Sequence, residues 1–220
     1  MRHDKDDLQA APSCRLARLH LGAVLLASAG MAHAAPDARD EQHLQRWIAE
    51  QKQESAVAAF GEHLRQQGVR DVVPLHQLLR TASDWNEPAC KAIEAPPFEV
   101  PERTKWAQTV KTLKFLRLLR DQQVLPQFEV VSAYRNEAVD KCAQGKGSRH
   151  PTAGAFDLLI PPGERPAAVE RLCTFFWKHG SKHRMGFSQY QSGRLHIDTV
   201  RYGTWGDDGH IGTSVCRRGP

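Results

Sequence analysis

The period of the apolar residues changes near Pro126, and this change constrains the fold more than any other feature of the sequence. Upstream, apolar side chains recur every three or four residues, which predicts helices over about 40–67 and 103–121 and a short helix over 72–80. The proline-rich stretch 82–103 predicts an irregular loop. Downstream, short β-rich runs predominate. Helices followed by strands indicate an α+β fold.

Three β-rich runs predict a small sheet in the C-terminal half. They cover residues 128–132, 155–160 and 195–200. A helix that Pro166 opens and Gly180 closes separates the second run from the third. We therefore expect N-terminal helices followed by a small, mainly antiparallel sheet with flanking helices. The domain boundaries that we expect are 1–34 for a leader, 35–85 for a helical extension and 86–220 for the main domain.

The predicted leader resembles a secretory signal peptide. A short apolar run over 21–32 follows Arg15 and Arg18, and small residues at Ala32 and Ala34 suit a signal peptidase. A membrane anchor is the alternative, but a full span needs about 20 apolar residues. We expect cleavage after Ala34 and a periplasmic or secreted protein without a membrane span.

Four cysteines follow the leader, and export to an oxidising compartment favours two disulfides among them. Four cysteines allow three connectivities. We favour Cys90–Cys142 and Cys173–Cys216, because each pair joins neighbours in the sequence. A zinc site made of all four cysteines is disfavoured, because no two of them have the close C-x-x-C spacing.

The formal net charge of +5 suits an anionic partner. Export argues against nucleic acid and favours an anionic polymer of the cell envelope. The basic residues are scattered, so an ordinary solvated surface also accounts for the charge.

Three side chains in or beside the predicted strands are typical of a metal site. His150 lies in a loop just before a strand, whereas Asp157 and His196 lie within strands. Two histidines and one carboxylate leave the fourth tetrahedral position open for water, as in catalytic zinc sites. A carboxylate between Phe156 and Leu158 must be paired, metal-bound or exposed. With 11 histidines in the chain, spacing alone is a weak argument.

The order of these residues resembles the zinc D-Ala-D-Ala carboxypeptidase and murein endopeptidase family. The run from Ser148 through His150 to Asp157 is similar to the family's Ser-x-His-x-x-Gly-x-Ala-x-Asp signature. The segment 132–135 resembles its Ser-Gly-Tyr-Arg strand end, and 195–199 resembles its closing His-Ile-Asp segment. The resemblance covers about residues 86–210, and residues 35–85 have no counterpart.

The resemblance implies a fold of the hedgehog and D,D-peptidase type, with Zn²⁺ held by His150, Asp157 and His196. It implies that Arg135 stabilises an oxyanion or binds a substrate carboxylate, for which a guanidinium is suited. It also implies that Ser148 orients a ligand or substrate. An ordinary salt bridge for Arg135 and a loop cap for Ser148 are the structural alternatives.

Two positions depart from the family pattern. Ala153 replaces the signature glycine, which follows one residue later as Gly154. Many family members carry an acid three residues before the last histidine ligand, and this chain has Gly193 there. Asp198 faces the same side of its strand as His196. It could act as the general base or only orient the histidine.

The sequence therefore predicts a zinc-dependent peptidase that hydrolyses peptide bonds in peptidoglycan stem peptides or cross-links, as a D-Ala-D-Ala carboxypeptidase or a murein endopeptidase. We expect a monomer. A zinc-binding but inactive peptidoglycan-binding module is the alternative, which Gly193 motivates. A disulfide-stapled exported domain without a metal is a third reading. No other cofactor is indicated, because no strand precedes a glycine-rich phosphate loop.

Overall fold

The structure is a computed structural model that describes residues 38–145 and 147–217. The signal peptide predicted over 1–34 lies outside these residues. Within the described part of the chain, no helix has the length and apolar character needed to cross a membrane.

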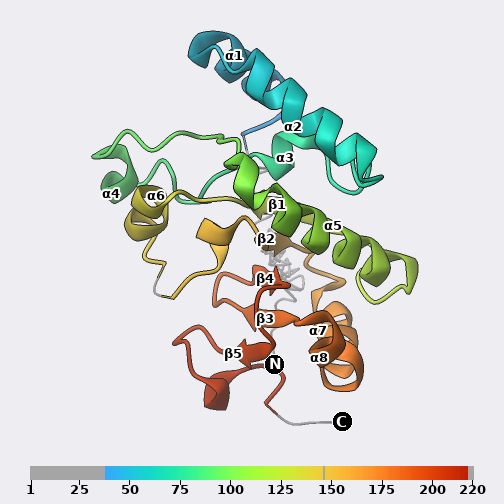
Figure 1. The fold of residues 1–220 in the computed structure, drawn as a ribbon. Helices are drawn as coiled ribbons and strands as arrows, with labels where there is room; N and C mark the ends of the chain where they lie inside the picture. The colour runs from blue at the N-terminus through green and yellow to red at the C-terminus, as the bar shows by residue number, and fades with distance from the viewer. Residues whose placement is uncertain (1–37, 146, 218–220) are drawn as a thin grey trace, which may run out of the picture. The chain divides into compact units, whose positions relative to one another are not determined.

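Two helices occupy the stretch for which the sequence predicted one (Figure 1). They are α1 (Glu41–Gln51) and α2 (Glu54–Gln66), and the short α3 (Leu75–Leu78) follows. Asp40 caps α1, since its side chain accepts a hydrogen bond from the backbone N–H of His43 at 2.8 Å. The single helix over 40–67 is wrong. Lys52 adopts a left-handed φ of 54° and ends α1 there.

The middle of the chain contains one long helix and two short ones. They are α4 (Pro88–Lys91), α5 (Trp106–Asp121) and α6 (Glu137–Cys142). The prediction for α5 is confirmed. The prediction of an irregular loop misses α4, and α6 was also not predicted, because helices of four and six residues are too short to show a period.

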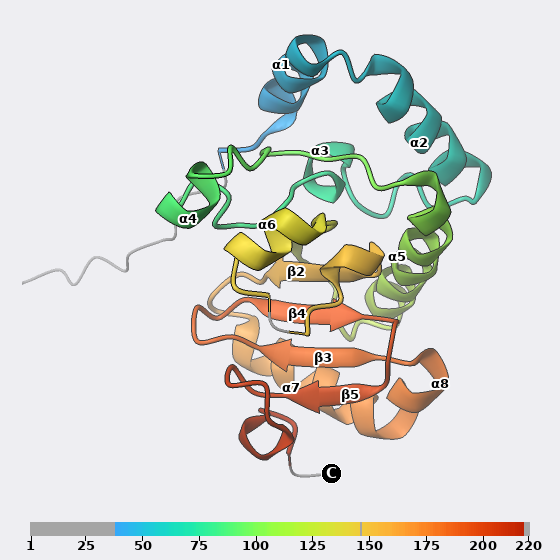
Figure 2. The same ribbon diagram turned by 60° about the vertical axis from the view of Figure 1, so that its left-hand side comes forward.

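Five strands form one mixed sheet in the order β1-β2-β4-β3-β5. Figure 2 shows β2, β4, β3 and β5 side by side in this order. They are β1 (Glu129–Ser132), β2 (Ala155–Leu159), β3 (Gly186–Gln189), β4 (Leu195–Asp198) and β5 (Gly203–Trp205). Neighbouring strands run antiparallel except β3 and β5, which run parallel. The expected α+β class with a mainly antiparallel sheet is confirmed. Strands β3 and β5 were not predicted.

The helix predicted from Pro166 to Gly180 continues past its expected end. It comprises α7 (Arg165–Phe175), a wider turn over Phe176–Gly180 and the short α8 (Ser181–His183). Gly180 therefore does not close the helix. Arg184, with a left-handed φ of 54°, follows α8 and ends the segment.

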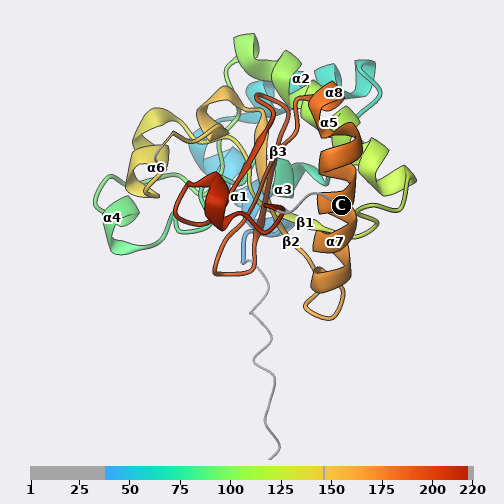
Figure 3. The same ribbon diagram turned by 90° about the horizontal axis from the view of Figure 1, so that it is seen from below.

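The two faces of the sheet have different roles. Figure 3 shows α7 along one side of the sheet and α4 and α6 along the other. Side chains alternate along a strand, so one face can be apolar while the other is polar. The apolar strand residues join the core with side chains of α7; they include Phe156, Leu158, Phe187, Leu195, Ile197, Leu172 and Phe175. The same core includes residues of α1 and α2, so it extends across the predicted boundary at 85/86.

Both predicted disulfides are confirmed. Cys90–Cys142 joins α4 to α6, and Cys173–Cys216 joins α7 to the C-terminal segment. The first bridge therefore holds α6 on the polar side of the sheet. The second fastens the last described residues to the helix that covers the apolar side.

Candidate metal centre

A row of polar side chains crosses the face of the sheet opposite the apolar core. The strand register pairs Ser132 with Asp157, Asp157 with His196, and His196 with Ser188. Residues that pair across neighbouring strands point to the same face. The register therefore brings Asp157 beside His196, although 39 positions separate them in the sequence.

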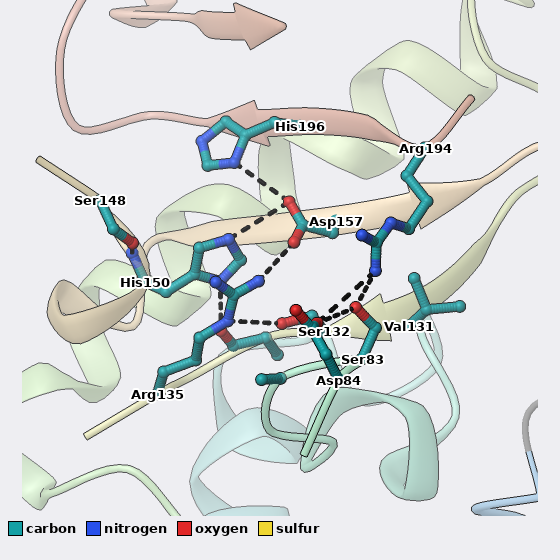
Figure 4. A network of polar contacts seen from close by, with 12 residues as sticks. Ser83, Asp84, Val131, Ser132, Arg135, Ser148, His150, Asp157, Arg194 and His196 are labelled. Atoms are coloured by element: carbon teal, nitrogen blue, oxygen red, sulfur yellow. Dashed lines mark hydrogen bonds and ion pairs between the residues drawn. The ribbon is translucent and has the colours of Figure 1, made fainter. Parts of the chain in front are cut away.

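The three predicted metal ligands meet at one point on this row (Figure 4). Oδ1 of Asp157 lies 3.2 Å from Nε2 of His150 and 3.2 Å from Nδ1 of His196. His150 reaches the row from the short turn His150–Thr152 that precedes β2. The exposed fractions are 1% for His150 and 2% for each of the other two. The group could hold a metal ion.

The second nitrogen of His150 is fixed by the backbone. Nδ1 lies 2.5 Å from the carbonyl oxygen of Ala133, which can only accept, so this nitrogen carries the hydrogen. Nε2 then presents its lone pair to Oδ1 of Asp157 when the ring is neutral. Two acceptors face one another at hydrogen-bond distance, an arrangement that a cation between them would stabilise.

The second nitrogen of His196 is fixed by a carboxylate. Nε2 donates to Oδ2 of Asp198 at 3.1 Å, while Oδ1 of Asp198 accepts from the backbone N–H of Val200 at 2.7 Å. Nδ1 is thus the nitrogen directed at Asp157. Carboxylates that orient a histidine in this way are common behind metal ligands. These contacts favour the orienting role of Asp198, and its role as general base stays a prediction.

Gly186 makes room for Asp198. A Cβ atom on Gly186, which pairs with Asp198 across β3 and β4, would lie 1.9 Å from Oδ2 of that carboxylate. Only glycine leaves space for the carboxylate beside β3 at this point. The absence of a side chain at 186 is therefore part of how the sheet positions His196.

The charges of the site reinforce this geometry. Burial, together with the neighbouring Arg135, lowers the pKa of His150 and favours its neutral ring. Burial alone would raise the pKa of Asp157, but the contacts with His150 and His196 and the charge of Arg135 hold that pKa well below its usual range. Burial opposes protonation of His196 as well, yet hydrogen bonds to Asp157 and Asp198 raise its pKa to about 9. Without a metal, the site thus keeps an ionised carboxylate beside one neutral imidazole, that of His150, and one protonated imidazole, that of His196.

Imidazole nitrogens and a carboxylate oxygen are the donors that zinc takes in catalytic sites. Here two nitrogens and one oxygen converge, and the other nitrogen of each ring is already held by Ala133 or Asp198. The donor set therefore fits a divalent transition metal with three protein ligands.

Arg135 lies among buried carboxylates. Its Nη2 donates to Oδ2 of Asp157 at 2.5 Å, its Nε donates to Oγ of Ser132 at 2.9 Å, and its Nη1 lies 3.6 Å from Asp140. The guanidinium occupies the second oxygen of Asp157 and leaves Oδ1 for the histidines. These contacts match the salt-bridge alternative. The catalytic and substrate-binding roles predicted for Arg135 stay predictions.

Ser148 and Gly193 are placed by loops next to the site. Oγ of Ser148 accepts from the backbone N–H of His150 at 3.1 Å, which caps the turn that carries this ligand. Its substrate-binding role stays a prediction. Gly193 has a left-handed φ of 80°, and a Cβ atom there would lie 2.2 Å from Nη1 of Arg165. An acid at 193 would therefore need a different turn.

Two residues of the site were not predicted. The hydroxyl of Tyr190 lies 3.3 Å from Nδ1 of His196, and burial raises the pKa of this tyrosine. Ser188, fully buried on β3, follows His196 in the polar row. Trp205 of β5 comes next, and its ring lies 5.2 Å from that of His196. A prediction of strand β3 would have placed Ser188 on this face.

No protein-family model, curated protein or solved structure matches the chain. The likeness to zinc peptidases therefore rests on the three sequence fragments and stays a prediction.

Proposed function

We propose that the protein is a zinc-dependent peptidase that hydrolyses peptide bonds in peptidoglycan stem peptides or cross-links. The observation that carries the proposal is the buried group of His150, Asp157 and His196, whose ligand atoms all lie within 4.8 Å of one another. The two disulfides suit an oxidising compartment, and we propose the periplasm or the exterior of the cell.

The proposed metal is zinc, held by Nε2 of His150, Oδ1 of Asp157 and Nδ1 of His196. When bound by three such ligands, zinc would lower the pKa of a bound water to about 7 and polarise a peptide carbonyl. The protein itself supplies orientation. Ala133 and Asp198 fix the two imidazoles, and Arg135 fixes the carboxylate.

The proposed substrate is a peptide that carries D-amino acids, a choice that comes from the resemblance of the three sequence fragments. The formal net charge of +5 supports an anionic polymer as the bulk partner. Carboxypeptidase action on D-Ala-D-Ala ends and endopeptidase action on cross-links are both compatible with this set of ligands.

A second candidate is a zinc-binding module that holds peptidoglycan peptides without cleaving them. Gly193 favours it, because this position lacks the side chain that the resemblance implies for a general base. Asp198 does not replace that acid directly, since its oxygens are engaged by His196 and by backbone N–H groups.

The zinc content of the purified mature protein tests the metal site first. We expect about one zinc per chain in the wild type, almost none in His196→Ala, and the wild-type content in His210→Ala, whose side chain is exposed. No zinc in the wild type after supplementation would overturn the proposal.

Digestion of purified peptidoglycan fragments by the zinc-loaded protein then separates the two candidates. Mass spectrometry of the products identifies the cleaved bond. We expect hydrolysis that is lost in His150→Ala and in the presence of a chelator. Binding of the fragments without any product would establish the binding module instead.

A further inference from the structure

Tyr190 lies in the turn that joins β3 to β4. Its backbone N–H donates to the carbonyl oxygen of Arg194 at 2.9 Å, and its own carbonyl oxygen accepts from Gly193 at 2.8 Å. These two bonds fix the turn immediately before His196. The side chain reaches His196, and the two rings stand nearly perpendicular to one another, at 82°.

The hydroxyl of Tyr190 contacts an atom of the candidate metal centre. It lies 3.3 Å from Nδ1 of His196, the nitrogen directed at Asp157. The phenol therefore stands beside the point where the ligand atoms converge, on a side chain that is not itself one of the three ligands.

A phenol at this point is a hydrogen-bond donor at neutral pH, because an ordinary tyrosine hydroxyl has a pKa of about 10. When the ring of His196 is neutral and no metal is bound, Nδ1 can accept its hydrogen. A metal that takes the lone pair of Nδ1 removes this acceptor. The hydroxyl hydrogen is then available to whatever oxygen enters the site.

We propose that Tyr190 is a catalytic residue, whose hydroxyl donates a hydrogen bond to the carbonyl oxygen of the scissile peptide bond. The inference rests on the proposed function. During hydrolysis the oxygen of water bonds to the carbonyl carbon, the C–N bond breaks, and the leaving amine takes a proton that water supplied. Tyr190 keeps its own proton and stabilises the negative charge that develops on oxygen.

The turn that carries Tyr190 supplies the site with a hydrogen-bond donor and not with an acid. Gly193 lies in the same turn with a left-handed φ of 80°, a backbone conformation that strains any residue with a side chain. Three residues earlier, the hydroxyl of Tyr190 reaches Nδ1 of His196. The turn thus contributes a neutral donor to the site. A donor of this kind stabilises the transition state more than the ground state, so it acts on kcat.

The variant Tyr190→Phe tests the proposal, with Tyr202→Phe as the matched control. Tyr202 is partly exposed and stacks on Phe176 at 4.7 Å between ring centroids. We would measure zinc content, the affinity of the zinc-loaded protein for a phosphinate analogue of a D-Ala-D-Ala peptide, and turnover. The phosphinate is a stable tetrahedral mimic whose oxygens can accept the hydrogen bond.

For Tyr190→Phe we expect unchanged zinc content, phosphinate affinity lowered roughly 10- to 100-fold, and kcat lowered about 10²- to 10³-fold with KM little changed. Tyr202→Phe should match the wild type in all three. Equal phosphinate affinity and equal kcat in Tyr190→Phe would overturn the proposal. Loss of zinc from this variant would also overturn it, because the hydroxyl would then be a ligand.

The phosphinate measurement keeps this test separate from that of the proposed function. A wild type that binds zinc and phosphinate but never cleaves would sink the peptidase assignment and, with it, the catalytic role of Tyr190. Equal phosphinate affinity and equal kcat in Tyr190→Phe, beside normal wild-type turnover, would instead overturn only the role of Tyr190.

Discussion

Asp198 accepts a hydrogen bond at 3.1 Å from the nitrogen of His196 that points away from Asp157. The ring therefore lies between two carboxylates, one that shares the candidate metal position and one behind it. The rear carboxylate decides which nitrogen carries the hydrogen, and this choice leaves Nδ1 for a metal.

Asp198→Asn should lower zinc affinity by about 10- to 100-fold. The amide keeps one oxygen for the backbone N–H of Val200, so its NH₂ faces the N–H of His196 and the tautomer becomes unfavourable. Competition with a chromophoric chelator measures the effect. Asp207→Asn, on an exposed loop, is the control and should bind zinc like the wild type. Unchanged zinc affinity with lost turnover would point to Asp198 as the general base.

Gly186→Ala should destabilise the protein and weaken zinc binding together. The new methyl group would overlap Oδ2 of Asp198, so either the strand or the carboxylate must move. Overpacking of this kind costs about 1–3 kcal/mol. Urea denaturation would measure the loss.

Gly203→Ala is the matched control, because Gly203 pairs with Gly186 across β3 and β5 and has open space at its Cβ position. We expect its free energy of unfolding to stay within about 0.5 kcal/mol of the wild type. Equal stability of the two variants would show that the position of the Asp198 carboxylate does not require glycine at 186.

Much of the metal site could be predicted from the sequence, for a physical reason. Asp157 lies within an apolar strand, where an ionised carboxylate needs a partner. His196 lies within another strand, and a regular antiparallel register carries the two to the same face. Strand context and the order of three fragments were therefore enough to select His150, Asp157 and His196.

The contacts around these ligands could not be predicted in the same way. Strand β3 has the sequence Gly-Phe-Ser-Gln and is too short to show alternation, so Ser188 and the turn that carries Tyr190 were missed. The partners of Arg135 depend on the packing of α6, a helix of six residues. Helix α1 ends at Lys52, which adopts a left-handed φ although it is not a glycine, so the sequence carries no signal for this break.

Arg135→Met should destabilise the metal-free protein by about 3–5 kcal/mol, because it leaves the buried carboxylates of Asp157 and Asp140 without their shared cation. Arg135→Lys should recover only part of this loss, because an ammonium group restores the positive charge but lacks the planar fork of donors. Arg117→Met is the control. Arg117 pairs with the exposed Asp71, and such surface pairs contribute less than about 1 kcal/mol. Similar losses in both methionine variants would contradict the positioning role of Arg135.

Zinc affinity should rise with pH. The pKa of His196 is raised to about 9 in the metal-free protein, because hydrogen bonds to Asp157 and Asp198 outweigh burial. Below that pH the ring holds a proton that zinc must displace, so affinity should increase up to about tenfold per pH unit between pH 6 and 8. The same proton should appear in solution on zinc addition, about one per metal at pH 7. Chelator competition across this range, with proton release measured in weak buffer, checks both. An affinity that does not change with pH would mean that His196 is already neutral before the metal binds.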